Sequence, residues 1–123
     1  MIAFGTTKGF IGWFSLRKVE EVVIVKSGSV SSIRQVYFVN NRSVVVFLQG
    51  ENEIYLCELS NPLKILGSYS SDGIIMCLTP LPELNCLAFA AANTTSLIFL
   101  SLTELKVIHT METNISMYFI IIF

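Results

Sequence analysis

Three short stretches decide the fold of this chain: Ile2-Ala3-Phe4-Gly5, Val45-Val46-Phe47-Leu48 and Leu87-Ala88-Phe89-Ala90. When they are aligned, their phenylalanines stand 43 and 42 residues apart. Self-similarity at a fixed spacing of about 20 to 50 residues is typical of repeat architectures, in which each unit packs on its neighbours. The chain is therefore built from repeats of about 42 residues.

Two further landmarks keep the same spacing. The segments that follow the phenylalanine stretches end in leucines that are 43 and 43 residues apart, in Phe14-Ser15-Leu16, Cys57-Glu58-Leu59 and Leu100-Ser101-Leu102. After a turn, each repeat continues into a lysine-containing apolar stretch: Lys18-Val19, Leu63-Lys64-Ile65-Leu66 and Leu105-Lys106-Val107-Ile108. Three independent landmarks thus share one period.

The apolar segments within each repeat are short, rich in Val, Ile, Phe and Tyr, and separated by Gly, Asn, Ser and Pro, which is typical of strands and tight turns. No stretch keeps a helical period for three turns. The predicted strands are residues 2–4, 10–16, 19–26, 32–39, 44–49, 53–59, 63–69, 74–79, 86–90, 96–101 and 105–111. Because propeller blades of the WD40 type contain four short strands in about 40 to 45 residues, we predict an all-β chain. Its fold class is a WD40-like β-propeller fragment of about three four-stranded blades.

The period divides the chain into the later part of one blade (1–26), a complete blade (32–69), another blade (74–111) and the inner strand of a further one (115–122). This division explains the composition, which is 53% hydrophobic and only 14% charged, against about 25% charged in a typical domain. Each blade packs on neighbours with both faces, so few positions are left for charge. About three blades cannot close a ring, and we expect the chain to be part of a larger propeller or a truncated product.

Composition also excludes several classes of function. The net charge is -1, with eight Lys and Arg scattered among nine acidic residues, so the basic patch of a nucleic-acid binder is missing. No wholly apolar run is longer than the seven residues of 117–123, which is far shorter than the roughly 20 residues of a spanning helix, so we predict no transmembrane segment. The amino terminus does not resemble a signal peptide, and we expect a cytoplasmic protein.

Candidate catalytic groups do not converge in the sequence. The turn Gly5-Thr6-Thr7-Lys8-Gly9 lacks the order of a phosphate-binding loop, and His109 is the single histidine. Glu20 and Glu21 are adjacent, so a strand directs them to opposite faces. Glu51 and Glu53 are interpreted as solvated carboxylates beside a hairpin turn.

The remaining candidates are interpreted as structural. Cys57, Cys77 and Cys86 form an odd set without a C-x-x-C pair, which favours buried, reduced thiols. Trp13 is expected to be buried between blades, and no ligand spacing typical of a metal site is present. We therefore predict no catalytic, cofactor-binding or metal-binding residues, no cofactor and no enzymatic activity.

The turn Gly5-Thr6-Thr7-Lys8-Gly9-Phe10, with the strand before it, resembles the opening blade of the PROPPIN family, the seven-bladed phosphoinositide-binding propellers of autophagy. Further segments resemble the family's blades: Ile33-Arg34-Gln35-Val36, Arg42-Ser43-Val44-Val45-Val46-Phe47-Leu48, Ile54-Tyr55-Leu56, Leu63-Lys64-Ile65-Leu66, Gly73-Ile74-Ile75-Met76-Cys77-Leu78-Thr79-Pro80 and Cys86-Leu87-Ala88-Phe89. No position matches the family's Phe-Arg-Arg-Gly motif, and the second blade is missing or collapsed between Lys26 and Ser32.

This resemblance implies a non-enzymatic scaffold in autophagy or membrane trafficking that has lost the lipid-binding residues of its family. It implies protein partners at blade edges and loops, and peripheral association with pre-autophagosomal or endosomal membranes as part of a complete propeller. Residues 2–59 also resemble the lethal-giant-larvae and tomosyn family of exocytic propellers, with fewer gaps. Two alternatives stay open: a propeller that regulates SNARE proteins, and a truncated product without independent function.

Overall fold

Eleven antiparallel strands form three separate sheets in the computed structural model, which describes residues 1–40 and 43–114. The first sheet contains β1 (Ile2–Gly5), β2 (Phe10–Ser15) and β3 (Lys18–Lys26). The second contains β4 (Ile33–Phe38), β5 (Val44–Gln49), β6 (Glu53–Glu58) and β7 (Lys64–Ser70), and the third contains β8 (Ile75–Leu81), β9 (Cys86–Ala91), β10 (Ser96–Ser101) and β11 (Val107–Glu112). Each sheet is a meander in which consecutive strands pair.

All eleven predicted strands are present, with ends that differ by at most two residues, and the all-β fold is confirmed. The first sheet has three strands among the described residues, and these are the three predicted for residues 1–26. Two details differ from the prediction. A short 3-10 helix, Pro82–Leu84, joins β8 to β9. Leu105 lies outside β11, because its left-handed backbone (φ 59°) buries the side chain in a turn. The inner strand predicted at 115–122 lies outside the described residues.

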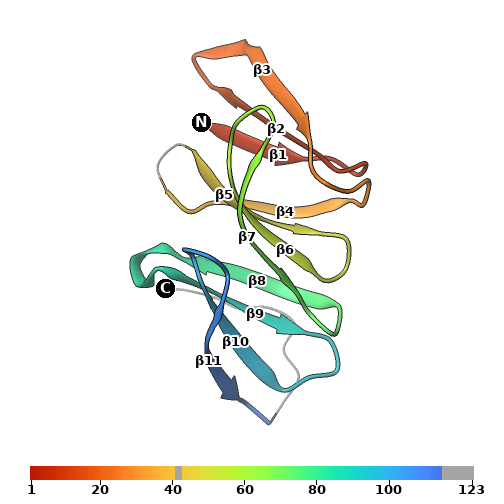
Figure 1. Cartoon of the computed structure of the whole chain (residues 1–123), viewed down its shortest axis with the longest axis vertical. Coiled ribbons are helices and arrows are strands. Elements are labelled where there is room, and N and C mark those ends of the chain that lie inside the picture. Colours follow the sequence, from red (N-terminus) through yellow and green to blue (C-terminus); the bar gives the residue numbers. More distant parts are fainter. Residues whose placement is uncertain (41–42, 115–123) are drawn as a thin grey trace.

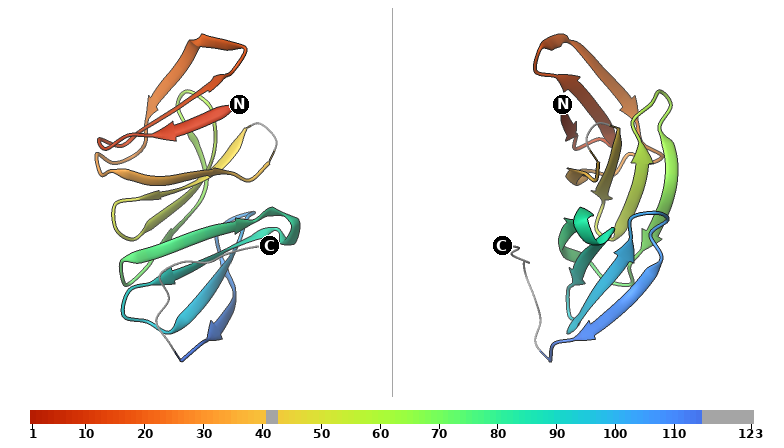
Figure 2. Two further views of the ribbon diagram at one scale, coloured as in Figure 1. Left: turned by 180° about the vertical axis from the view of Figure 1, so that it is seen from behind. Right: turned by 90° about the vertical axis from the view of Figure 1, so that its left-hand side faces the viewer.

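The three sheets follow one another along the molecule, with the first and third at opposite ends (Figure 1). Seen from the side, they form an arc, with β3, β7 and β11 on the convex side and β1, β4 and β8 toward the concave side (Figure 2). This is the arrangement of consecutive blades around a propeller axis, in which the first strand of each blade lies innermost.

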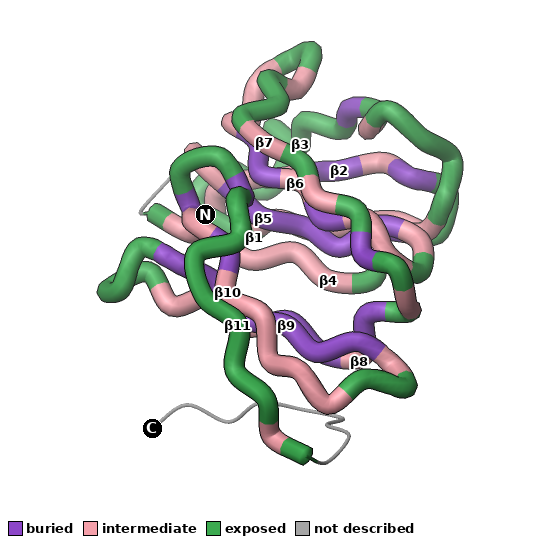
Figure 3. Tube along the Cα trace, turned by 60° about the horizontal axis from the view of Figure 1, so that its bottom comes forward, coloured by how far each residue is buried: buried purple, intermediate pink, exposed green. Residues whose placement is uncertain are grey.

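Burial follows the order of strands within a blade. Every residue of β9 and nearly every residue of β5 is buried, whereas β11 is exposed throughout and β3 is exposed except at Val25 (Figure 3). The second strand of a blade has strands on both sides and sheets over its faces. The outermost strand has a partner on one side and solvent on the other, which leaves apolar residues such as Val19 and Ile108 more than half exposed.

Two apolar clusters fill the spaces between the sheets. Phe47 and Val45 face the first sheet and pack with Ile11, while Val46 and Leu48 face the third sheet and pack with Phe89 and other residues of β8 to β10. This alternation is the two-residue period of a strand covered on both faces. The phenylalanines of the repeat thus occupy equivalent places, with Phe47 and Phe89 each packed against the preceding sheet.

The first two sheets approach each other closely at Gly5. A Cβ atom added there would lie 2.2 Å from Cγ2 of Ile33, which is well inside van der Waals contact. The first glycine of the Gly-Thr-Thr-Lys-Gly turn is therefore needed for packing between blades. Among the described residues, the structure contains no helix that is long and apolar enough to cross a membrane.

Candidate functional site

The residues considered for catalysis are dispersed over the three sheets. His109 is exposed on β11, where its ring lies 5.6 Å from that of Phe99, and Glu20 and Glu21 are exposed on β3. No group of three His, Cys, Asp or Glu side chains that could hold a metal ion is found in the described part of the chain. Trp13 is partly buried against the cluster between the first two sheets.

The cysteines are buried, reduced thiols in strands β6, β8 and β9, as predicted. Burial raises the pKa of Cys57 to about 12 and also raises the pKa values of Cys77 and Cys86. The thiolate is the reactive form of cysteine, so these thiols are poor nucleophiles at neutral pH.

One edge of the molecule gathers the β1–β2, β5–β6 and β9–β10 loops and the linkers between sheets. The hydrogen bonds at this loop face repeat from sheet to sheet. The amide of Ile33 donates to the carbonyl of Thr6 at 2.9 Å, and 42 residues later the amide of Ile75 donates to the carbonyl of Glu51 at 2.8 Å. The second and third sheets are therefore each tied to the preceding sheet by the first residue of their innermost strand.

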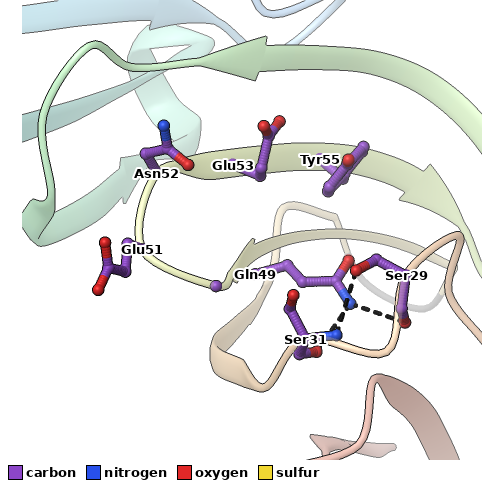
Figure 4. A pocket seen from close by; sticks show the side chains of 8 residues that line it. Ser29, Ser31, Gln49, Glu51, Asn52, Glu53 and Tyr55 are labelled. Carbon is purple, nitrogen blue, oxygen red and sulfur yellow. Dashed lines mark hydrogen bonds between the residues drawn. The ribbon is translucent and has the colours of Figure 1, made fainter.

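Gln49 fixes the linker between the first and second sheets. Its side chain is 1% exposed at the end of β5, and Nε2 donates to Oγ of Ser27 at 2.7 Å and to the carbonyls of Ser29 and Ser31 at 3.2 and 2.9 Å. Figure 4 shows this amide directed at the linker, beneath the β5–β6 hairpin. Because hydrogen bonds from one buried group hold three linker residues, the linker forms a fixed wall of the loop face.

Gly9 completes the support of this linker. Its φ is +85°, and an added Cβ would lie 2.1 Å from the carbonyl oxygen of Ser29. Its own carbonyl accepts a hydrogen bond from the amide of Ser27 at 2.9 Å. Glycine is required both by the left-handed backbone and by the closeness of the linker.

An acidic pocket of about 460 Å³ opens between this linker and the β5–β6 hairpin. Its lining residues are Ser29, Ser31, Gln49, Gly50, Glu51, Asn52, Glu53 and Tyr55 (Figure 4). The two carboxylates, which the sequence placed beside a hairpin turn, do lie there: Glu51 is exposed in the turn, and Glu53 begins β6. Glu53 accepts a hydrogen bond from Oγ of Ser70 at 2.7 Å.

Tyr55 forms the floor at one end of the acidic pocket. Its ring stacks on Phe47 at a centroid distance of 5.3 Å. Burial and, to a smaller extent, the nearby Glu53 carboxylate raise the pKa of Tyr55. The hydroxyl therefore stays protonated at neutral pH and can donate a hydrogen bond.

A second pocket, of about 420 Å³, lies on the other side of the same linker. It is lined by Lys8, Gly9, Phe10, Lys26, Ser27, Gly28, Ser29 and Val30. Its charged lining residues are thus lysines, in contrast to those of the acidic pocket, with which it shares Ser29. Val30 projects from the linker with 86% of its surface exposed, the most exposed large apolar side chain among the described residues.

Sequence reasoning did not find this pair of pockets. It treated residues 27–31 as a simple break between blades, because serine and glycine indicate only a loop. The one available signal was Gln49, a polar residue that ends the otherwise apolar strand Val44–Gln49. Such a residue needs a partner, but the sequence does not say which segment supplies it.

Arg34 is a second residue whose role depends on the folded structure. Its guanidinium donates to the carbonyls of Gly50 and Glu51 at 3.3 and 3.4 Å and, across to the third sheet, to the carbonyl of Ile75 at 3.1 Å. Arg34 thus links the β5–β6 hairpin beside the acidic pocket to the third sheet.

Comparison with solved structures identifies the class of fold. The chain superposes on the Myceliophteria thermophila Cps50 (Swd1) β-propeller domain with a TM-score of 0.74 and 14% identity, over 89% of this chain and 37% of that one. For the Neurospora crassa Pan2 WD40 domain the TM-score is 0.60 at 16% identity, over 95% of this chain and 36% of that one. Neither a protein-family model nor a curated protein sequence matches the chain.

These likenesses, together with the three meander sheets, define the chain as a WD40-type β-propeller segment. It spans little more than a third of the length of each of the two propellers. The loop face of this segment carries the two pockets, one on each side of the same linker.

Proposed function

We propose that this chain acts as a non-enzymatic protein-interaction scaffold and that its loop face binds an extended segment of a partner protein. The observation that carries the proposal is the pair of oppositely charged pockets on either side of the Ser27–Ser31 linker, with the exposed Val30 beside them. Protein-binding interfaces combine an apolar centre with a polar rim, and Val30 together with the polar pocket side chains beside it supplies both.

The charges of the two pockets determine the chain direction in which the partner segment binds. Lys8 and Lys26 favour an acidic end with an apolar residue that packs on Val30, whereas Glu51 and Glu53 favour a basic end. Complementary charge contributes to orientation and association rate more than to affinity. We therefore expect moderate affinity and a clear preference for one chain direction.

Peptide binding tests the proposal directly. The probe is a fluorescent peptide with two aspartates and a leucine at one end and two lysines at the other, compared by anisotropy with a peptide of the same composition in scrambled order. Lys26→Glu and Glu51→Lys are each expected to weaken binding several-fold, whereas Lys64→Glu, on the exposed strand β7, leaves it unchanged. Equal binding of the two peptides, or equal effects of all three substitutions, contradicts the proposal.

The cellular setting that we propose is autophagy or membrane trafficking, in the cytoplasm and at the surface of pre-autophagosomal or endosomal membranes. Its support is the resemblance of the Gly5-to-Phe10 turn and the following blades to the PROPPIN family. The family's Phe-Arg-Arg-Gly motif has no counterpart here, so we expect no binding to phosphoinositide vesicles by this chain alone. Flotation with liposomes that contain phosphoinositides is the test, and recovery of the chain with them overturns the proposed loss of lipid binding.

The alternative setting is exocytosis, because residues 2–59 align with the lethal-giant-larvae and tomosyn family with fewer gaps. Under that alternative the chain binds a helical SNARE segment rather than an extended peptide. A pull-down with SNARE-motif peptides, in which the same two loop-face substitutions are compared, distinguishes the two settings.

A further inference from the structure

We infer that the partner segment carries two basic side chains separated by one residue, which enter the acidic pocket and a third pocket on the other side of the β5–β6 hairpin. This inference rests on the proposed function and specifies the basic end of the segment. The third pocket has a volume of about 270 Å³. It is lined by the hairpin, by residues 72–74 before β8 and by the β9–β10 loop.

The three pockets of the loop face follow one another from the first sheet to the third. The second pocket and the acidic pocket share Ser29, and the acidic pocket and the third pocket share Glu51 and Asn52. Pockets that share lining residues are adjacent, so an extended segment can cross all three in order. The charged lining residues are lysines in the second pocket and carboxylates in the other two. The acidic part of the loop face therefore extends to the third sheet.

The acidic pocket and the third pocket each combine two carboxylates with an apolar side chain. In the acidic pocket, Glu51 and Glu53 lie beside the ring of Tyr55. In the third pocket, Glu51 and Asp72 lie beside Ile74, which is 42% exposed. Arginine and lysine match this combination, because each has an apolar stem that packs on apolar surface and a charged head that stays polar.

The carboxylates at the hairpin have no cationic partner within the described residues. Neither of the ion pairs found there includes Glu51, Glu53 or Asp72. The nearby guanidinium of Arg34 donates to backbone carbonyls, those of Gly50 and Glu51 among them, and forms no ion pair in this part of the chain. The carboxylates are therefore available to a cationic ligand.

A buried amide oxygen points independently to a ligand that donates hydrogen bonds. Gln49 lines the acidic pocket beneath the hairpin (Figure 4) and is 1% exposed. Its Nε2 donates to the linker, whereas its Oε1 has no hydrogen-bond partner among the described residues. A buried acceptor without a donor is unfavourable. Ammonium and guanidinium groups carry only donors, so a basic side chain supplies what this oxygen and the carboxylates lack.

The spacing of the two basic residues follows from the geometry of an extended segment. Successive side chains point to opposite faces, and residues i and i+2 share one face at a separation of about 7 Å. The two pockets are neighbours that share Glu51, so consecutive positions on one face suit them. The basic end of the segment is therefore a basic-x-basic motif, in which the middle residue faces solvent.

Fluorescence anisotropy with the full chain and two peptides tests the spacing. Both peptides carry two aspartates and a leucine at one end, and the other end reads Arg-Ser-Arg in the first and Arg-Arg-Ser in the second. The composition is identical, but adjacent arginines point to opposite faces. The Arg-Ser-Arg peptide is expected to bind several-fold more tightly. Equal affinity of the two peptides overturns the inference.

Neutral variants of the pocket carboxylates test the placement of the second arginine. Asp72→Asn is expected to weaken the Arg-Ser-Arg peptide several-fold and to leave unchanged a peptide that ends in Arg-Ser-Ser. Glu51→Gln is expected to weaken both, because Glu51 lines both pockets. Glu20→Gln, on the exposed strand β3, is the matched control and is expected to change neither affinity.

The Lys26→Glu variant separates this inference from the proposed function. If Lys26→Glu weakens binding while Asp72→Asn has no effect on the Arg-Ser-Arg peptide, the inference is overturned and the proposed function stands. If Asp72→Asn weakens the Arg-Ser-Arg and Arg-Ser-Ser peptides equally, the third pocket does not receive the second arginine. If neither variant changes the affinity, both proposals are wrong.

Discussion

The first and second sheets carry the same sequence pattern but lie in different surroundings. In the second sheet Phe47 is 1% exposed, because the first sheet covers it. In the first sheet the equivalent Phe4 is only partly buried, and its ring has the neighbouring Phe14 at 6.3 Å. Ile2 on the same strand is 37% exposed. In this fold the burial of an apolar side chain therefore depends on a neighbouring sheet that covers it. The repeat provides each sheet with apolar side chains on both faces, one set for each neighbour.

Truncation of these two phenylalanines is the strongest test of that comparison. Phe47→Ala leaves a cavity between two sheets and is expected to lower the free energy of unfolding by about 3–5 kcal/mol. Phe4→Ala removes a ring that is only partly buried and is expected to lower the free energy of unfolding by about 1–2 kcal/mol. Urea unfolding is measured at a protein concentration low enough to keep the chain monomeric. Equal losses contradict the view that the first sheet has an uncovered face.

The next largest effect is expected from two glycines at the junction of these sheets. Gly9→Ala combines a left-handed backbone with a Cβ that would lie 2.1 Å from the carbonyl of Ser29, and it is expected to cost about 2 kcal/mol or more. Gly28→Ala, in the same junction, has no atom within 4 Å of the added Cβ and is expected to change stability by less than about 1 kcal/mol. Thermal unfolding of both variants measures the difference. A similar loss in the two variants means that the linker is not fixed as described.

The local sequence pattern predicted the strands, because the residues that specify a strand, a turn or a repeat lie next to one another in the chain. Phe4, Phe47 and Phe89 identified equivalent strands, and their spacing predicted the propeller class before any contact was known. The loop face could not be predicted in this way. The hydrogen-bond partners of Gln49 lie about 20 residues away in the sequence. Arg34, in the second sheet, donates a hydrogen bond to Ile75 in the third sheet. Such contacts depend on how blades are placed relative to one another, which the periodicity of a single blade does not encode.

Arg34 gives a smaller effect and tests the junction between the second and third sheets. Arg34→Ala removes three hydrogen bonds at a partly exposed site and is expected to cost about 1 kcal/mol. Arg34→Lys is expected to recover little, since a single ammonium cannot reproduce the planar fork. Arg17→Ala, in the exposed turn between β2 and β3, is the matched control. Full rescue by lysine indicates that charge alone, rather than the bonds to both sheets, stabilises the junction.

The smallest expected effect on stability at neutral pH comes from the titration of Cys57. This residue lies in the second sheet, which has a neighbouring sheet on each face. Burial raises the pKa of this thiol to about 12, whereas an unfolded cysteine titrates near 8.5. The unfolded state therefore loses its proton first, so Cys57 reduces stability as the pH rises from about 9 toward 12 and has no effect at pH 7. Urea unfolding of the wild type and of Cys57→Ala at a series of pH values isolates this contribution from other titrating groups. The stability difference between the two is expected to shift in favour of the alanine variant above pH 9, and a constant difference contradicts the burial of this thiol between two sheets.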